Sequence, residues 1–289
     1  MNFTSELKNP IFRTIQIVAD ELEYPTYVVG GWVRDLLLDR KQEKTDIDFV
    51  CIGSGIKLAE KVAKKLGDAA SFKVFKNFGT AMIHYNGEDY EFVGARKESY
   101  RNGSRKPIVE NGTLEDDQNR RDFTINAMSI QLNKDNFGLL IDPFNGQKDL
   151  TNGIIRTPLS PDITYSDDPL RMMRAVRFAT QLNFEIEEKS YQSIKGNAER
   201  LSIISQERIT EELNKIISSN TPSKGFKMLF STQLLHQFFP QMVKLQGVEF
   251  KGKHGHKDNF YHTIEVLDNI CKNTNNLWLR WAAILHDIA

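Results

Sequence analysis

Two carboxylates stand two positions apart in a stretch with the composition of a β-strand. Asp46 and Asp48 alternate with the apolar residues Ile47 and Phe49. Because side chains alternate across a strand, both carboxylates should project from one face while the apolar residues enter a core. Paired carboxylates suit a magnesium ion that also takes oxygens from a substrate phosphate. The spacing therefore makes Asp46 and Asp48 candidate catalytic residues and candidate ligands for a Mg²⁺ cofactor.

A glycine pair upstream has the composition of an anion-binding turn. Gly30 and Gly31 follow an apolar run at 27–29 and precede a predicted short helix at 32–38. Glycine lets the backbone approach a phosphate closely, and the free N–H groups at a helix start attract anions. Arg34, one turn into the helix, could add a charge-assisted hydrogen bond. These three residues are candidates for binding a triphosphate.

Each of these motifs is weak evidence by itself. An Asp-x-Asp pair in a strand is most often solvated, and a Gly-Gly pair is often only a turn. Their succession within residues 27–50 is much rarer, and it resembles the DNA polymerase β-like nucleotidyltransferase superfamily. The resemblance implies an α/β head with a mixed β-sheet, the nucleotidyltransferase fold. Glu91, in a neighbouring predicted strand, is a candidate third acidic ligand, although strand glutamates are usually solvated.

Further blocks follow in the same order as in one branch of that superfamily. They lie at 120–128 (RRDFTINAM), 142–150 (DPFNGQKDL), 167–178 (DDPLRMMRAVRF) and 207–213 (ERITEEL). With the first two motifs they resemble a class II tRNA nucleotidyltransferase, the CCA-adding enzyme, from about residue 27 to 213. The resemblance implies template-independent, magnesium-dependent addition of CMP and AMP to the 3′ end of tRNA. CTP and ATP would be the substrates, and pyrophosphate would be released.

The block at 167–178 carries arginines at a regular spacing. Asp168 precedes a predicted helix on which Arg171, Arg174 and Arg177 recur every three residues. Read alone, Asp168 is a helix cap and the arginines are surface charges. The resemblance implies that Asp168 and Arg171 instead hydrogen-bond the base edge of incoming cytosine or adenine, since acceptor and donor complement such an edge. Arg174 and Arg177 would contact phosphates or buttress this helix.

The block at 120–128 supplies two more candidates. By the same resemblance, Arg121 and Asn126 would bind the ribose and triphosphate of the nucleotide. Arg120 and Asp122 could instead pair with each other or with neighbours. One departure concerns Asp167, where many relatives carry glutamate; the charge is kept in a shorter side chain. The block at 207–213 would brace the base-recognition helix, or be an ordinary charged helix.

The remaining sequence predicts a mixed α/β part followed by helices. The predicted domains are a nucleotidyltransferase head at 1–155, a helical neck with the base-recognition helix at 156–230, and the start of a helical body at 231–289. A long mobile loop at 97–118 would shift as the site changes specificity from C to A. The predicted secondary structure consists of strands at 27–29, 47–52, 80–85 and 90–93 and helices at 32–38, 56–66, 170–182, 186–196, 206–217, 224–230, 259–272 and 277–288.

The last segment contains a histidine-rich pattern. His262, with the dipeptide His286-Asp287, resembles an HD-type metal phosphohydrolase domain. Imidazoles and a carboxylate are reasonable ligands for a transition metal. Because the sequence stops before a distal aspartate could complete the set, we expect a truncated HD-like segment without phosphohydrolase activity.

Composition narrows the class of protein without naming it. With 40% hydrophobic and 26% charged residues, the chain can bury a core. No uncharged apolar run approaches the roughly 18 residues of a membrane span. The 38 basic and 38 acidic residues balance, so an RNA partner would have to meet local basic patches. Cys51 and Cys271 are too few for a disulfide framework, and we expect reduced thiols in a cytoplasmic protein.

Two other functions fit the same motifs. A poly(A) polymerase, or an enzyme that adds only CC or only A, would share the head and neck chemistry. An RNA-binding protein with a decayed catalytic head would also keep the fold, although intact Asp46 and Asp48 argue against decay. The sequence predicts no oligomeric state.

Overall fold

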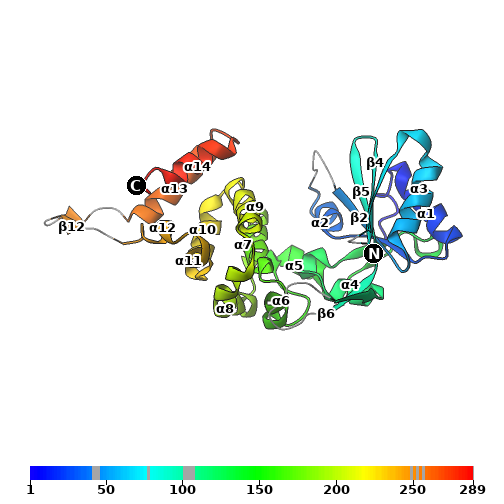
Figure 1. Ribbon diagram of the computed structural model, residues 1–289, viewed down its shortest axis with the longest axis horizontal. Coiled ribbons are helices and arrows are strands. Elements are labelled where there is room, and N and C mark those ends of the chain that lie inside the picture. The colour runs from blue at the N-terminus through cyan, green and yellow to red at the C-terminus, as the bar shows by residue number, and fades with distance from the viewer. Residues whose placement is uncertain are drawn as a thin grey trace. The chain divides into compact units, whose positions relative to one another are not determined.

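The computed structural model describes residues 1–40, 46–76, 79–99, 108–247, 250–251, 254–255 and 258–288. The chain forms two compact units, Met1–Asn152 and Gly153–Ala289. The first unit is built around a sheet, and the second is mainly helical (Figure 1). This confirms the predicted order of an α/β head followed by helical segments. The further division of the helical part at residue 230 stays a prediction.

A seven-stranded mixed sheet forms the centre of the first unit. Its strand order is β3-β4-β5-β2-β1-β8-β9. β2 runs parallel to β5, and the other neighbours are antiparallel. The strands are β1 (Thr26–Val29), β2 (Asp46–Cys51), β3 (Ser71–Phe75), β4 (Thr80–Tyr85), β5 (Glu88–Gly94), β8 (Ser129–Gln131) and β9 (Leu140–Ile141).

Helices α1 and α3 lie together against one face of this sheet (Figure 1). Phe49 of β2 is fully buried there, with its ring 5.0 Å from that of Phe92 and 6.0 Å from that of Phe12 in α1. The alternation of β2 thus places its apolar residues under the helices, as predicted. The helices of this unit are α1 (Pro10–Glu21), α2 (Gly31–Leu37), α3 (Gly55–Leu66), α4 (Leu114–Asn119), α5 (Gly146–Asn152) and the 3₁₀ turns η1 (Gly67–Ala69), η3 (Thr124–Asn126) and η4 (Lys134–Asn136).

The opposite side of the sheet carries polar and partly exposed side chains. Cross-strand register places Asp48 of β2 opposite Glu91 of β5, Glu91 opposite Met82 of β4, and Met82 opposite Lys73 of β3. Paired residues in a sheet project to the same side. We call this side, with Asp46, the open face. It is the face on which both predicted metal ligands lie.

The hairpin predicted at Asn86-Gly87 is present. β4 and β5 pair from Thr80–Val93 to Tyr85–Glu88. Asn86 and Gly87 have φ values of 53° and 83°. Positive φ at both central residues is the geometry of the two-residue turn that matches strand twist, which is why Asn-Gly favours it.

The irregular loop predicted at 97–118 is wrong for most of that segment. β6 (Arg96–Ser99) pairs antiparallel with β7 (Ile108–Asn111), and α4 begins shortly afterwards. Thr113 caps α4 through a reciprocal capping box with Asp116, a Thr-x-x-Asp signal that the polar composition obscured. Residues 100–107 lie outside the described part of the chain, so the predicted motion stays a prediction.

The second unit consists mainly of helices. α7 occupies the residues predicted for the base-recognition helix and packs against α9 and α10. Gly225 permits the close approach of α10, since a Cβ there would lie 2.5 Å from the side chain of Ile216. The elements are α6 (Pro161–Asp167), α7 (Leu170–Leu182), α8 (Glu188–Asn197), η5 (Ala198–Ile203), α9 (Gln206–Ile217), α10 (Pro222–Ser231), α11 (Leu234–Phe238), α12 (Pro240–Val243), α13 (Asn259–Cys271), α14 (Leu277–Leu285) and the strands β10 (Ile154–Ile155), β11 (Glu185–Ile186), β12 (Phe250–Lys251) and β13 (His254–Gly255).

Among the residues that the structure describes, none of the helices has the length and apolar character needed to cross a membrane.

Candidate active site

The site begins with three carboxylates on the open face. Asp46 is exposed and Asp48 is partly buried, and Glu91 lies in register with Asp48 on the parallel neighbour strand. Burial raises the pKa of the Asp48 carboxyl to about 6; Arg121 opposes this rise, while Glu91 and Asp46 add to it. Like charges that raise a carboxyl pKa in this way make a donor set suited to a hard divalent cation. The acidic residues therefore fit a metal, with Glu91 next to the predicted pair.

The glycine turn lies directly against this carboxylate group. Gly30 has φ of 77°, a conformation that residues with a side chain rarely adopt. A Cβ at Gly30 would lie 3.2 Å from Nη1 of Arg121 and 3.5 Å from Oδ2 of Asp48. Gly31 is the first residue of α2. The sheet thus brings the predicted phosphate turn, Arg121 and one predicted metal ligand into a single cluster.

A buried aspartate that sequence reasoning missed holds Arg121 in place. Oδ2 of Asp117 accepts hydrogen bonds from Nε of Arg121 at 3.0 Å and lies 2.8 Å from its Nη2. Oδ1 of Asp117 accepts a bond from Nε of Arg120 at 3.0 Å. Burial raises the pKa of the Asp117 carboxyl, but the charges and hydrogen bonds of Arg121 and Arg120 together lower that pKa by more. The net shift of the pKa is therefore downward. The sequence spacing could have indicated this pairing, because Asp117 stands three positions before Arg120 and four before Arg121, the spacing at which side chains meet on a helical turn.

Arg34 and Asn126 meet each other in the interior. Nη1 of Arg34 donates to Oδ1 of Asn126 at 2.9 Å, and Nδ2 of Asn126 donates to Oδ1 of Asp122 at 3.0 Å. Nε and Nη2 of Arg34 donate to the two carboxylate oxygens of Asp35 at 2.9 and 2.8 Å. Both predicted nucleotide ligands are buried in this network. These contacts fix α2 against η3 and so position the glycine turn, and a direct contact with nucleotide stays a prediction.

The predicted base-recognition residues lie at the start of α7 in the second unit. Oδ1 of Asp168 accepts a bond from the backbone N–H of Leu170 at 3.3 Å, and α7 begins at Leu170, as predicted. Asp168, Arg171 and Arg174 are partly exposed.

Arg177 differs from the other arginines of this helix because it is buried. Its Nε lies 3.0 Å from Oε2 of Glu212 in α9, and its guanidinium carbon lies 4.1 Å from the ring centroid of Phe178. Arg174 lies against the same ring at 5.4 Å. Of the two predicted roles, Arg177 has the geometry of a buttress, and the segment 207–213 supplies its partner.

The histidines near the end of the chain also come together. Ligand atoms of His262, His286 and Asp287 all lie within 4.8 Å of one another. Nε2 of His286 is 3.2 Å from Oδ2 of Asp287, and its Nδ1 is 2.7 Å from the carbonyl oxygen of Ala283. The expected absence of phosphohydrolase activity stays a prediction.

A mixed sheet with paired strand carboxylates beside a glycine turn and a helix start defines a nucleotidyltransferase head. The poly A polymerase head domain matches residues 26–156, and a domain described as "Probable RNA and SrmB- binding site of polymerase A" matches residues 183–245. These matches cover the sheet, the glycine turn and part of the helical unit.

Known relatives narrow the class further. The chain is 40% identical over 229 residues to a CCA-adding enzyme of Lactobacillus helveticus, covering 78% of this chain and 53% of that one. It is 37% identical over 237 residues to an A-adding tRNA nucleotidyltransferase of Geobacter sulfurreducens, covering 81% and 26%. A solved complex of a CCA-adding enzyme with ATP matches with a TM-score of 0.74 at 31% identity, covering 96% of this chain and 62% of that one.

The chain belongs to the class II tRNA nucleotidyltransferases. It spans about half the length of the CCA-adding enzyme from L. helveticus and about a quarter of the A-adding relative from G. sulfurreducens.

Proposed function

We propose that this protein adds CMP and AMP to the 3′ end of tRNA, using CTP and ATP and releasing pyrophosphate. The observation that carries the proposal is the cluster formed by Asp48, Gly30 and Arg121 on the open face. It combines an acidic group for a divalent cation with a backbone turn and a cation for a triphosphate. The names of the relatives, CCA-adding and A-adding enzymes, support tRNA as the acceptor.

In the proposed reaction, the terminal 3′ oxygen of the RNA forms a bond to the α-phosphorus of the nucleotide. The bond from that phosphorus to the bridging oxygen breaks, pyrophosphate leaves with the electron pair, and the hydroxyl proton passes to water. Asp46 and Asp48 would hold magnesium, which supplies positive charge to the reacting phosphoryl oxygens. Gly30, Gly31 and Arg121 would bind and orient the triphosphate. Positioning and electrostatics contribute most of the catalysis in such transfers.

Choice of nucleotide is proposed to lie in the second unit. Asp168 presents acceptors and Arg171 presents donors, and both side chains are accessible. Arg177 would support the helix through Glu212, while Arg34 and Asn126 would hold the phosphate turn and the ribose side of the site. A cytoplasmic location is the expectation that follows from a tRNA substrate.

The test incubates the purified chain with MgCl₂ and a tRNA transcript that ends at the discriminator base. CTP alone, ATP alone and both together are compared by product length on a sequencing gel. We expect two additions with CTP and a third when ATP is also present. The Asp46→Asn variant should give no product above background. Long A tails would support a poly(A) polymerase instead.

Addition of A alone is the second candidate, because relatives of that name match the chain as well as CCA-adding enzymes do. A transcript already ending in CC separates the two. Extension of that transcript by one A, with no extension of the shorter one by CTP, would identify an A-adding enzyme. Absence of product from both transcripts, with retained RNA binding, would favour the RNA-binding alternative.

A further inference from the structure

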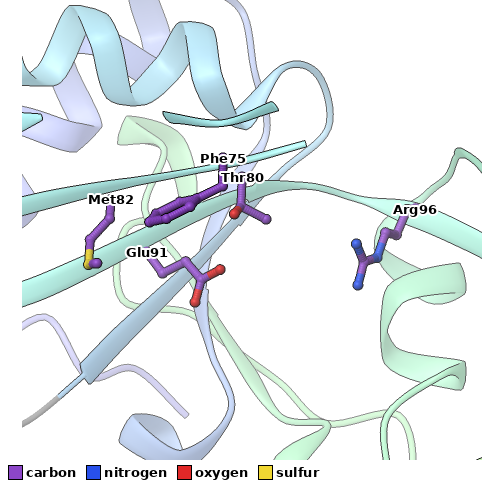
Figure 2. Close-up of a pocket in the computed structure, with 5 residues that line it drawn as sticks. All are labelled: Phe75, Thr80, Met82, Glu91 and Arg96. Carbon is purple, nitrogen blue, oxygen red and sulfur yellow. The ribbon is translucent and has the colours of Figure 1, made fainter. Parts of the chain in front are cut away.

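A pocket of about 400 Å³ opens on the open face beside the carboxylates. Its lining residues are Phe75, Thr80, Met82, Glu91 and Arg96. Figure 2 shows the side chains of Phe75, Thr80, Met82 and Glu91 gathered on neighbouring strands, with Arg96 facing them from a separate segment. The volume lies within the range of small-molecule sites in proteins. Two apolar side chains, a carboxylate and a guanidinium thus share one pocket.

The pocket and the glycine turn lie on opposite sides of β2. On one side, β1 pairs with β2 and leads into Gly30. On the other side, β5 places Glu91 in register with Asp48, and β4 places Met82 in register with Glu91. Neighbouring strands are about 4.8 Å apart, so the pocket begins about one strand spacing from Asp48. Asp48 therefore lies between the glycine turn and the pocket, which Glu91 lines.

The positions of the pocket, Asp48 and the glycine turn along the sheet constrain where the attacking and leaving groups can lie. In phosphoryl transfer the attacking and leaving oxygens lie roughly in line through the phosphorus. If the glycine turn and Arg121 bind the triphosphate, the leaving group lies on the β1 side. The attacking hydroxyl must then approach from the side of β5 and β4, where the pocket lies.

The chemistry of the pocket suits a nucleoside. Phe75 is 40% exposed on β3, a strand at the edge of the sheet. An exposed ring gives a base a surface on which to stack, and stacking accepts any base. Met82 supplies a polarisable thioether at the floor of the pocket. Lys73, exposed and on the same face two residues before Phe75, adds positive charge along the strand.

We propose that this pocket binds the terminal nucleoside of the acceptor RNA, with its base on Phe75 and its 3′ oxygen toward Asp48 and Glu91. Arg96 contributes positive charge near the RNA phosphates. The inference rests on the proposed function, because it assumes that the open face performs nucleotide transfer. It adds a binding site for the acceptor strand to the nucleotide site, and Phe75 becomes a residue for positioning that strand.

The first measurement uses a short RNA hairpin with 2-aminopurine as its 3′-terminal base. Stacking quenches 2-aminopurine fluorescence, and the signal needs no catalysis. We expect quenching when the hairpin saturates the wild-type chain, loss of that quenching in Phe75→Ala, and its return in Phe75→Trp. Val74→Ala is the matched control, because Val74 has similar exposure, 36%, on the same strand but projects to the other face. Absence of quenching by the wild type, or unchanged quenching by Phe75→Ala, would overturn the proposal.

Steady-state kinetics provide the second readout. Phe75→Ala should raise KM for the RNA acceptor about tenfold and leave KM for CTP within about twofold, since loss of one stacking contact acts on the acceptor alone. Val74→Ala should leave both values unchanged. An equal rise in both KM values for Phe75→Ala would indicate a general distortion of the head and contradict the proposal.

The proposed function and the proposed RNA pocket can fail separately. A wild-type chain that quenches 2-aminopurine through Phe75 but incorporates no nucleotide would contradict the proposed function and keep the RNA pocket. A chain that incorporates nucleotides with no contribution from Phe75 would keep the function and reject the pocket.

Discussion

Asp48 combines a proposed catalytic role with an unfavourable environment. Its side chain is partly buried and lies near Asp46 and beside Glu91, its register partner on the neighbouring strand β5. Burial together with these two neighbours raises the pKa of the Asp48 carboxyl to about 6. In the unfolded chain the same group titrates near its ordinary value of 3.8. The folded state without a metal therefore binds this proton more tightly than the unfolded state does. Ionised Asp48 consequently lowers the free energy of unfolding at neutral pH.

The first prediction concerns the variant Asp48→Asn. Its free energy of unfolding in EDTA at pH 7.5 should exceed that of the wild type by about 1–3 kcal/mol, the equivalent of the raised pKa. The penalty in the wild type is complete above pH 6 and disappears as pH falls toward 4, so the two proteins should converge below pH 4. Urea denaturation at several pH values measures this. The variant should be inactive in nucleotide addition.

Asp46→Asn is the control for this experiment, since Asp46 is exposed on the same strand and its replacement should change stability by less than about 0.5 kcal/mol. A wild type that is more stable than Asp48→Asn across the whole pH range would show that Asp48 makes net favourable contacts in the metal-free fold.

The features of the site that follow from local sequence patterns were the most predictable. Alternation around Asp46 and Asp48 was enough to place both on one face, and the glycine pair was enough to locate the turn. The pairing of Arg34 with Asp35 and Asn126 was not predictable in the same way. Asn126 is 92 positions away in the sequence, and only the tertiary fold brings the two side chains together.

At the scale of elements, the contact between α7 and α9 includes a buried ion pair beside its apolar packing. The side chains of Arg177 and Glu212 are 10% and 5% exposed, and Glu212 also accepts a bond from Lys215 at 3.2 Å. A buried charge left without its partner is strongly destabilising. The pair therefore holds α7, with Asp168 and Arg171 at its start, against α9.

The second prediction is that Glu212→Gln lowers the free energy of unfolding by about 3 kcal/mol, because it removes the buried negative charge that lies 3.0 Å from Nε of Arg177. Glu211→Gln, an exposed change at the adjacent position, should have an effect below about 0.5 kcal/mol. Thermal unfolding followed by circular dichroism compares the two variants. Equal effects of both variants would show that the pair does not stabilise the helix contact.

Most elements with strong periodicity were predicted, although the amphipathic helix α1 was missed, and the short polar elements were not predicted. The bounds of α7 match the prediction because its apolar residues recur at helical spacing between a proline and a left-handed Asn183. The pair β6–β7 and the helix α4 were read as loop, because their stability comes from pairing and capping instead of apolar periodicity. β3 was missed for a similar reason: it lies at the sheet edge and is largely exposed.

At the scale of the whole molecule, the division after Asn152 predicts an independent head. The sheet and the helices α1 to α5 lie in residues 1–152, and the short parallel ladder of β10 with β11 stays within the second unit. A unit of this size can bury enough surface to fold alone. A cut after Asn152 would therefore leave the two strands of each described pair in the same fragment.

The third prediction is that a chain of residues 1–152 unfolds in a single cooperative transition in urea and is stabilised by MgCl₂. The shorter chain 1–128 is the control: it lacks β8, which pairs with β1 along the sheet, and it should not fold cooperatively. A fragment 1–152 that binds hydrophobic dyes and lacks a transition would mean that the head needs the helical unit in order to fold.

The raised pKa of Asp48 also bears on how this protein would change under mutational drift. On the proposed function, a replacement that removes the charge would increase the stability of the metal-free fold and end nucleotide addition. In a lineage freed from the need for catalysis, stability would favour such replacements at once, and position 48 would be among the first to lose its acid. Screens that enrich variants of this protein only for heat resistance should therefore collect changes at Asp48, and a parallel requirement for activity is needed to keep them out.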